Sequence, residues 1–279
     1  MHGSPFSDRI AVSLTGRSVS VQIAGRGVPI LLLHGYPLDS RLWDRLVPLL
    51  ATDYLCIAPD LRGFGNNAEE PTSFSIVDLA DDCAKVLDAL QIRRPCIVCG
   101  LSMGGYVAMQ FVERHIERIA SAILTNTRCK SDDATGVSLR YSVATSALRI
   151  GVSATVAPML EKLLSPETLR CQASVVELVR SMVFETRAST IAWSQLAMAH
   201  REDFAKKMMS WNLPVTCVGG ALDSICPPGV IEQMHHAIPN SKMVLVNDSA
   251  HLTPLECPDE FAAIVRLHSL CSGTAQAVR

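Results

Sequence analysis

The sequence has no excess of charge of either sign and no long run of apolar residues. Its 279 residues include 25 Lys and Arg and 27 Asp and Glu, a formal net charge of −2, without a basic stripe. This balance argues against nucleic acid as a partner. No apolar stretch approaches the length of a membrane-crossing helix, so we expect no membrane association. The first residues, MHGSP, do not begin a charged and then apolar secretion signal, and we therefore expect a cytoplasmic protein.

The ten cysteines do not have the spacing of a metal site. Cys96 and Cys99 form a C-x-x-C pair, but residues three apart in a strand point to opposite faces, so the two cannot share a zinc ion. Others, such as Cys56 and Cys217, lie in apolar strand-like runs, where a free cysteine behaves as a small buried hydrophobe. We expect reduced core cysteines, with no disulfide and no metal ion.

Strand-like runs alternate with helical patterns along most of the chain, of which 48% is hydrophobic. This alternation predicts an α/β fold with a mostly parallel, doubly wound sheet of about eight strands. The strand-like runs are residues 10–14, 19–24, 30–33, 54–58, 96–99, 120–124, 215–219 and 243–247. The helical patterns lie near residues 42–50, 75–90, 103–115, 229–237 and 258–270.

The alternation stops between about Asn126 and Trp211, where helical spacing replaces strands, for example at Leu139, Val143, Ala147 and Ile150. We interpret residues 126–211 as a helical cap on a core domain formed by residues 1–125 and 212–279. Apolar side chains of this cap are candidates to line an acyl pocket, although for any single one of them the core of the cap itself is the simpler explanation. These candidates are Met159, Leu163, Met182, Trp193, Leu196 and Met198.

The most informative motif is GLSMG at residues 100–104, between a strand-like run and a helix-like segment. A strand–turn–helix with this pattern is typical of a nucleophile elbow. The tight turn strains the backbone of Ser102 and projects its hydroxyl toward a base. Gly100 and Gly104 leave room for the turn. Because the pattern also occurs in ordinary glycine-rich turns, the partners of the serine decide its meaning.

An acid and a histidine follow Ser102, each after its own strand-like run. Asp223 follows residues 214–219, and His251 follows residues 243–247. Sites of open α/β sheets lie at these carboxyl ends of strands. The order serine, acid, histidine is that of the α/β-hydrolases and not of the two common protease folds. The sequence therefore predicts a Ser102–His251–Asp223 triad.

Other candidates for the acid and the base rank lower. Asp248 is close to His251 in sequence but is better explained as a loop-turn residue. Asp132 and Asp133 follow the strand-like run at residues 120–124 and rank below Asp223. His34 also lies at a strand end, where we expect it to shape a turn.

The second half of an oxyanion hole is expected near the N-terminus. Residues 29–33 read as a buried strand and lead into HGYP at residues 34–37. Pro37 has no N–H to donate, so the amide of Tyr36 is the expected donor. The amide of Met103 would be the other, because the start of a helix favours a developing negative charge.

These motifs together resemble the α/β-hydrolase superfamily, in particular small bacterial serine carboxylesterases of thermophilic planctomycetes that act on short acyl chains. The resemblance covers about residues 19–265 and rests on HGYP (34–37), PDLRGFG (59–65), GLSMGGY (100–106), Asp223 with Pro227 and Pro228, and Ala250 with His251. It implies Ser102 as nucleophile, His251 as general base and acid, and Asp223 as the orienting acid. The chain departs from the family pattern at Asn66, Asn67, Ser249 and Thr253.

The expected reaction is a two-step acyl transfer on a small-molecule ester with a short to medium acyl chain. It needs no cofactor, and we expect a monomer or a small homo-oligomer. A lactonase, a carbon–carbon bond hydrolase, or a cofactor-free haloperoxidase or perhydrolase would use the same residues. A charged residue placed to receive a substrate carboxylate would favour the lactonase or the carbon–carbon hydrolase. A non-catalytic ligand receptor is the alternative from another class.

Overall fold

The structure of the protein is a computed structural model, and residues 8–67 and 72–273 of it are described. The strands are β1 (Asp8–Leu14), β2 (Arg17–Gly25), β3 (Val28–Leu33), β4 (Tyr54–Pro59), β5 (Cys96–Leu101), β6 (Ile119–Thr125), β7 (Val215–Gly220) and β8 (Lys242–Val246). They form one eight-stranded sheet in the order β1-β2-β4-β3-β5-β6-β7-β8. β2 pairs antiparallel with β1 and β4, and the other pairs are parallel, which confirms the predicted sheet.

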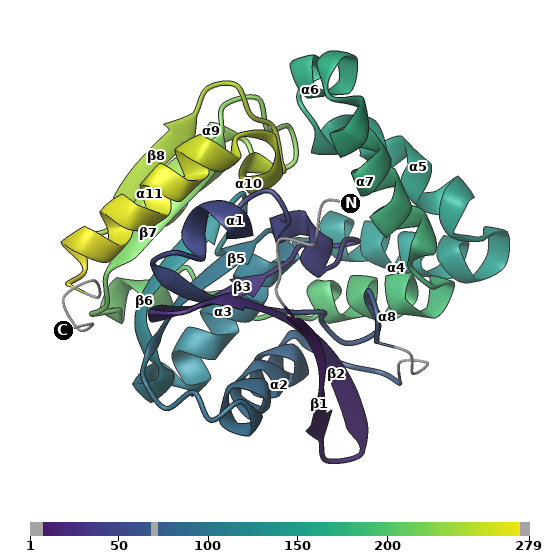
Figure 1. Cartoon of the computed structure of the whole chain (residues 1–279). Coiled ribbons are helices and arrows are strands. Elements are labelled where there is room, and N and C mark those ends of the chain that lie inside the picture. The colour runs from purple at the N-terminus through teal and green to yellow at the C-terminus, as the bar shows by residue number, and fades with distance from the viewer. Residues whose placement is uncertain (1–7, 68–71, 274–279) are drawn as a thin grey trace.

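The central strands are apolar throughout because both faces of the sheet are covered. Every residue of β3, β5 and β7 is buried, as expected of parallel strands between two helical layers. The helices of the core are α1 (Val47–Leu50), α2 (Ile76–Ala89), α3 (Met103–Arg114), α9 (Pro228–Ala237), α10 (Thr253–Glu256) and α11 (Pro258–Cys271). Figure 1 shows α1 and α11 on one face of the sheet and α2 and α3 on the other.

The helix predicted near residues 42–50 is wrong as a single element. The chain instead forms a 3₁₀ turn, η1 (Ser40–Trp43), followed by the short α1. Pro48, within the first turn of α1, has no N–H to donate to the preceding turn, so one continuous α-helix cannot form here. By contrast, α2 begins as predicted at Ser75, where a capping box with Asp78 satisfies the first amides.

Five helices lie between β6 and β7 and occupy one side of the molecule (Figure 1). They are α4 (Ala134–Ile150), α5 (Val152–Leu163), α6 (Pro166–Cys171), α7 (Ala173–Glu185) and α8 (Ala188–Ala199). The helix predicted from Leu139 to Ile150 exists, but both of these side chains are 64% exposed. Of the four predicted positions Ala147 is buried and Val143 is partly buried, and the buried face of α4 also includes Ala144, which lies outside the predicted spacing.

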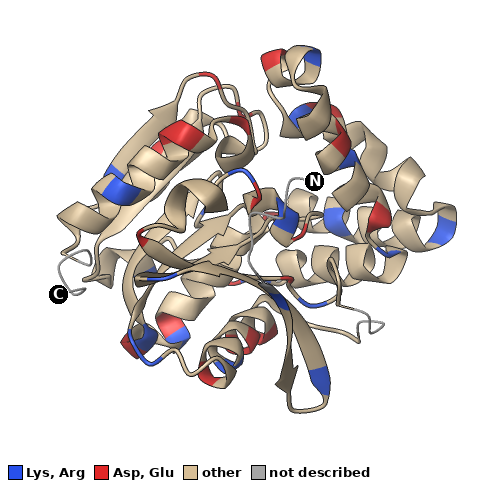
Figure 2. Cartoon of the chain, viewed as in Figure 1, with Lys and Arg blue, Asp and Glu red and all other residues tan. Residues whose placement is uncertain are grey.

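Charged residues of both signs are spread over the molecule, and most of the cysteines are buried. Figure 2 shows basic and acidic residues intermingled over the core and the helical insertion. Seven cysteines are buried, but Cys171 and Cys271 are exposed, so the prediction of core cysteines was wrong for these two. In the described part of the chain, none of the helices has the length and apolarity to span a membrane.

Candidate active site

Ser102 occupies the turn between β5 and α3 with φ +54° and ψ −114°, a conformation that is strained for a non-glycine residue. Two flanking glycines make this turn possible. A Cβ at Gly100 would overlap the carbonyl of Gly104, and a Cβ at Gly104 would overlap the carbonyl of Leu33. The hydroxyl of Thr127 donates to the carbonyl of Ser102 at 2.8 Å. The turn is therefore supported by fixed contacts on both sides.

The HGYP loop after β3 lies against this turn. A Cβ built on Gly35 would be 3.2 Å from the Cβ of Ser102, so the backbone next to Tyr36 abuts the serine. Met103 is the first residue of α3, where an amide has no partner within the helix. These positions suit the two predicted oxyanion donors, whose role remains a prediction.

His251 and Asp223 form a buried pair at the carboxyl edge of the sheet, after β8 and β7. Nδ1 of His251 lies 2.8 Å from Oδ2 of Asp223. A carboxylate at this distance holds the proton on Nδ1 and leaves Nε2 as the basic nitrogen. Nε2 is buried and has no hydrogen-bond partner among the described residues. The pair is thus arranged to accept a proton at Nε2.

The carboxylate of Asp223 is held in its ionised form. Its Oδ1 accepts hydrogen bonds from the amides of Ile225 at 2.8 Å and Cys226 at 2.9 Å. Burial alone would raise the pKa of Asp223, but the hydrogen bonds and charge of His251, with Asn126 and the Cys226 amide, lower this pKa below its usual value. A permanent negative charge beside the imidazole follows.

Two buried polar residues that sequence reasoning missed hold these loops together. The Nδ2 of Asn126 donates to Asp223 Oδ2 at 2.9 Å and to the Ala250 carbonyl at 3.0 Å. The Glu256 carboxylate accepts from the amide of Ala250 at 2.9 Å and from that of Ser165, in the helical insertion, at 2.6 Å. The sequence held one signal for Asn126, because an asparagine directly after β6 lies at the same sheet edge as the serine. It held no signal for Glu256.

The lower-ranked candidates lie elsewhere or are already occupied. His34 uses both ring nitrogens, on the Gly35 carbonyl at 3.0 Å and the Leu61 amide at 2.9 Å, and therefore shapes a turn. Asp132 pairs with two arginines, Asp133 caps α4 by accepting from the Gly136 amide, and Asp248 is exposed.

A metal ion could in principle use the same region, because ligand atoms of Asp223, Cys226 and His251 lie within 4.8 Å of one another. The chemistry of the trio disfavours this use. Nδ1 of His251 is already bound to Asp223, and burial raises the pKa of Cys226 to about 11. The thiolate that metals prefer is therefore scarce at neutral pH.

The six predicted acyl-pocket residues divide into two groups. Leu163, Met182 and Met198 are buried in the hydrophobic core, as the simpler explanation expected. The partly buried residues are Met159, Trp193 and Leu196, and these stay candidates for contact with substrate.

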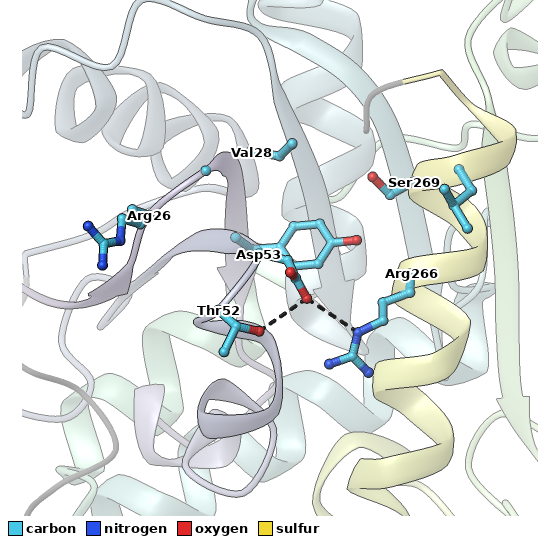
Figure 3. Close-up of a pocket in the computed structure, with 9 residues that line it drawn as sticks. Arg26, Val28, Thr52, Asp53, Arg266 and Ser269 are labelled. Carbon is cyan, nitrogen blue, oxygen red and sulfur yellow. Dashed lines mark hydrogen bonds and ion pairs between the residues drawn. The ribbon is translucent and has the colours of Figure 1, made fainter. Parts of the chain in front are cut away.

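The pocket drawn in Figure 3 lies at the opposite edge of the sheet. It has a volume of about 560 Å³ and is lined by the start of β3, the start of β4 and by α11. Its main polar contact joins Arg266 to Asp53, whose carboxylate also accepts from Thr52. None of the predicted catalytic residues lines it, and the amino ends of strands are not where such folds carry their sites.

A parallel sheet with a strained serine at a strand-to-helix turn, and a buried histidine–aspartate pair at the same edge, defines the class of the α/β hydrolases. The family model for the alpha/beta hydrolase fold matches residues 28–258, and the chain belongs to this family.

Similar proteins of this family are esterases. A pimeloyl-[acyl-carrier protein] methyl ester esterase of Aeromonas hydrophila is 27% identical and covers 89% of this chain and 98% of its own length. The solved structure of a thermophilic esterase from Thermogutta terrifontis, with malate bound, is 31% identical, covers 95% and 99% of the two chains and has a TM-score of 0.89. An enol-lactonase from Burkholderia xenovorans LB400, at 23% identity and a TM-score of 0.86 over 93% and 99%, shares the fold. The predicted enzyme class, a carboxylic ester hydrolase, is confirmed.

Proposed function

We propose that the protein hydrolyses short- to medium-chain acyl esters through Ser102, His251 and Asp223, with an acyl-enzyme intermediate. The observation that carries this proposal is the buried pair in which Asp223 holds Nδ1 of His251 at 2.8 Å and Nε2 lacks a partner among the described residues. A histidine held in this way acts as a general base, which accepts a proton at Nε2 from a neighbouring donor. Ser102, on its strained turn, is the proposed donor and nucleophile.

In the first step, Nε2 of His251 accepts the Ser102 proton while Oγ attacks the ester carbonyl. The amides of Tyr36 and Met103 stabilise the oxyanion that develops. His251 then returns the proton to the leaving alcohol. In the second step water attacks the acyl-enzyme by the same route, with His251 again as the base.

Hydrolysis of p-nitrophenyl esters from acetate to palmitate tests this proposal. We expect Ser102→Ala to lower kcat by roughly a thousandfold or more, because triad members act as a unit. Ser138→Ala, on the exposed surface of α4, is the matched control and should retain wild-type activity. Wild-type turnover by Ser102→Ala would contradict the proposal, and so would peroxide-dependent halogenation that exceeds hydrolysis.

A further inference from the structure

Three arginines gather beside the proposed site with a single carboxylate among them. Nη2 of Arg201 lies 2.7 Å from Oδ1 of Asp132, and Nε of Arg140 pairs with Oδ2 of the same carboxylate. The guanidinium of Arg201 also stacks over the ring of Tyr106 at 4.4 Å. Arg128, the third arginine, has no carboxylate partner among the described residues. The cluster therefore carries a surplus of positive charge.

Arg128 connects this cluster to the proposed catalytic residues. It directly follows Thr127, whose hydroxyl binds the Ser102 carbonyl at 2.8 Å. Its Nη2 donates to the carbonyl of Ile225 and lies 3.6 Å from Sγ of Cys226. That sulfur is within 4.8 Å of ligand atoms of both Asp223 and His251. The guanidinium thus contacts the loop that carries Asp223, and the backbone of Arg128 adjoins the residue that supports the serine turn.

Two guanidinium N–H groups of this region are buried without a partner in the described structure. They are Nε of Arg128 and Nε of Arg201. Arg201 is buried, with 7% exposure, and Arg128 is half-buried. Buried donors are almost always satisfied in native proteins, and an uncompensated buried charge is costly. Two buried guanidinium donors without a partner, next to an arginine without a carboxylate partner, favour an anionic ligand at this place.

We propose that the substrate is a carboxylic ester, open-chain or cyclic, that carries a carboxylate away from the scissile bond, and that Arg128 binds this carboxylate. The planar guanidinium fork matches a carboxylate better than it matches a neutral ester. Arg140 and Arg201, balanced in part by Asp132, add to the positive field and position the site. This inference rests on the proposed function, because it names the substrate class of that same serine-dependent hydrolysis.

The kinetic test compares esters matched in length and differing in charge: monomethyl adipate against methyl hexanoate, and a carboxylated against an unsubstituted lactone. We expect the wild type to favour an anionic member by about ten- to a hundredfold in kcat/KM, the range of one charge-assisted contact. Arg128→Gln should abolish this preference, Arg128→Lys should retain part of it, and Arg149→Gln, at an exposed site on α4, should leave it intact.

A binding test separates this inference from the proposed function. Calorimetry with glutarate and butyrate is done on Ser102→Ala, alone and combined with Arg128→Gln. Tighter binding of glutarate that is lost with Arg128 supports the carboxylate site even if no ester is hydrolysed. Serine-dependent hydrolysis of neutral esters without any preference for anionic ones overturns the inference and leaves the proposed function standing. An equal loss on both members of each pair in Arg128→Gln shows a structural role and also overturns it.

Discussion

At the scale of single residues, the acid of the proposed triad depends on an asparagine whose conformation is as constrained as that of the serine. Asn126 has φ +48°, a region that asparagine tolerates better than most residues. This backbone directs its side-chain amide to Asp223 and the Ala250 carbonyl. Asn126 is therefore a positioning residue for the aspartate and histidine loops.

Asn126→Gly removes this amide and keeps a backbone that accepts positive φ. We expect kcat to fall roughly tenfold, the worth of one hydrogen bond to a charged group, with a smaller change in KM. Asn240→Gly is the matched control, because Asn240 also has positive φ (+56°) but is exposed and remote from the site. Steady-state kinetics of both variants test this prediction. An equal fall in kcat in Asn126→Gly and Asn240→Gly would contradict the positioning role of Asn126.

At the scale of elements, the crossing of α3 over β3 and β5 requires glycine. Gly104 faces the carbonyl of Leu33, where a Cβ would overlap backbone that cannot move aside. The same contact sets the angle at which α3 leaves the sheet and hence where Ser102 points. The packing of α3 on the sheet and the position of Ser102 therefore both depend on the absence of a Cβ at Gly104.

Gly104→Ala should lower the free energy of unfolding by about 3 kcal/mol or reduce soluble expression, since overpacking against backbone is not relieved by a rotamer change. Gly229→Ala provides the control, because it lies in α9 with nothing within 4 Å of the new Cβ. We expect this second variant to match or exceed the wild type, owing to the better helix propensity of alanine. Urea unfolding of both variants measures the difference; a Gly104→Ala protein of wild-type stability would refute the expected overlap.

At the scale of the whole molecule, buried histidines make the fold sensitive to acid. His268 of α11 is hydrogen-bonded to Thr216 of β7 at 2.8 Å, and burial lowers its pKa to about 4. Burial also lowers the pKa of His34. Between about pH 6.5 and 4 the unfolded chain binds a proton at His268 that the folded chain does not. The contribution of neutral His268 to the free energy of unfolding is thus complete above this pH window and is lost as the pH falls through it.

We expect the wild type to lose up to about 3 kcal/mol more than His268→Gln when the pH is lowered from 7 to 4. His236→Gln, at an exposed position, should behave as the wild type. Burial raises the pKa of Asp44 to about 6, which acts in the opposite direction but equally in all three proteins. Urea unfolding at the two pH values tests this, and parallel losses in all three would exclude His268 as the cause.

We propose a cytoplasmic location and a monomeric or small homo-oligomeric state for the whole molecule. Both can be measured on the intact protein, by fractionation and by sedimentation.

The strands of the sheet and the chain order of the candidate catalytic residues could both be predicted from the amino-acid sequence alone. Short continuous apolar runs bounded by turn signals are typical of central parallel strands, and the residue that follows such a strand emerges at the carboxyl edge of the sheet. Ser102, Asp223 and His251 could therefore be selected before any coordinates, because each follows its own strand. Local turn chemistry is short-range and can be read from neighbours along the chain.

Which residues from distant segments come into contact became clear only from the folded structure. The contacts of Asn126 with Asp223 and of Glu256 with Ser165 join positions 97 and 91 residues apart, and no local pattern encodes them. The same holds for Arg128, which sequence reasoning passed over, and for the face of α4, where apolar spacing selected Leu139 and Ile150 together with Ala147 although only Ala147 of these three is buried. Periodicity predicts that a helix forms, but the shape of the surface it packs against decides which side is buried, and partners for polar groups are set by that packing.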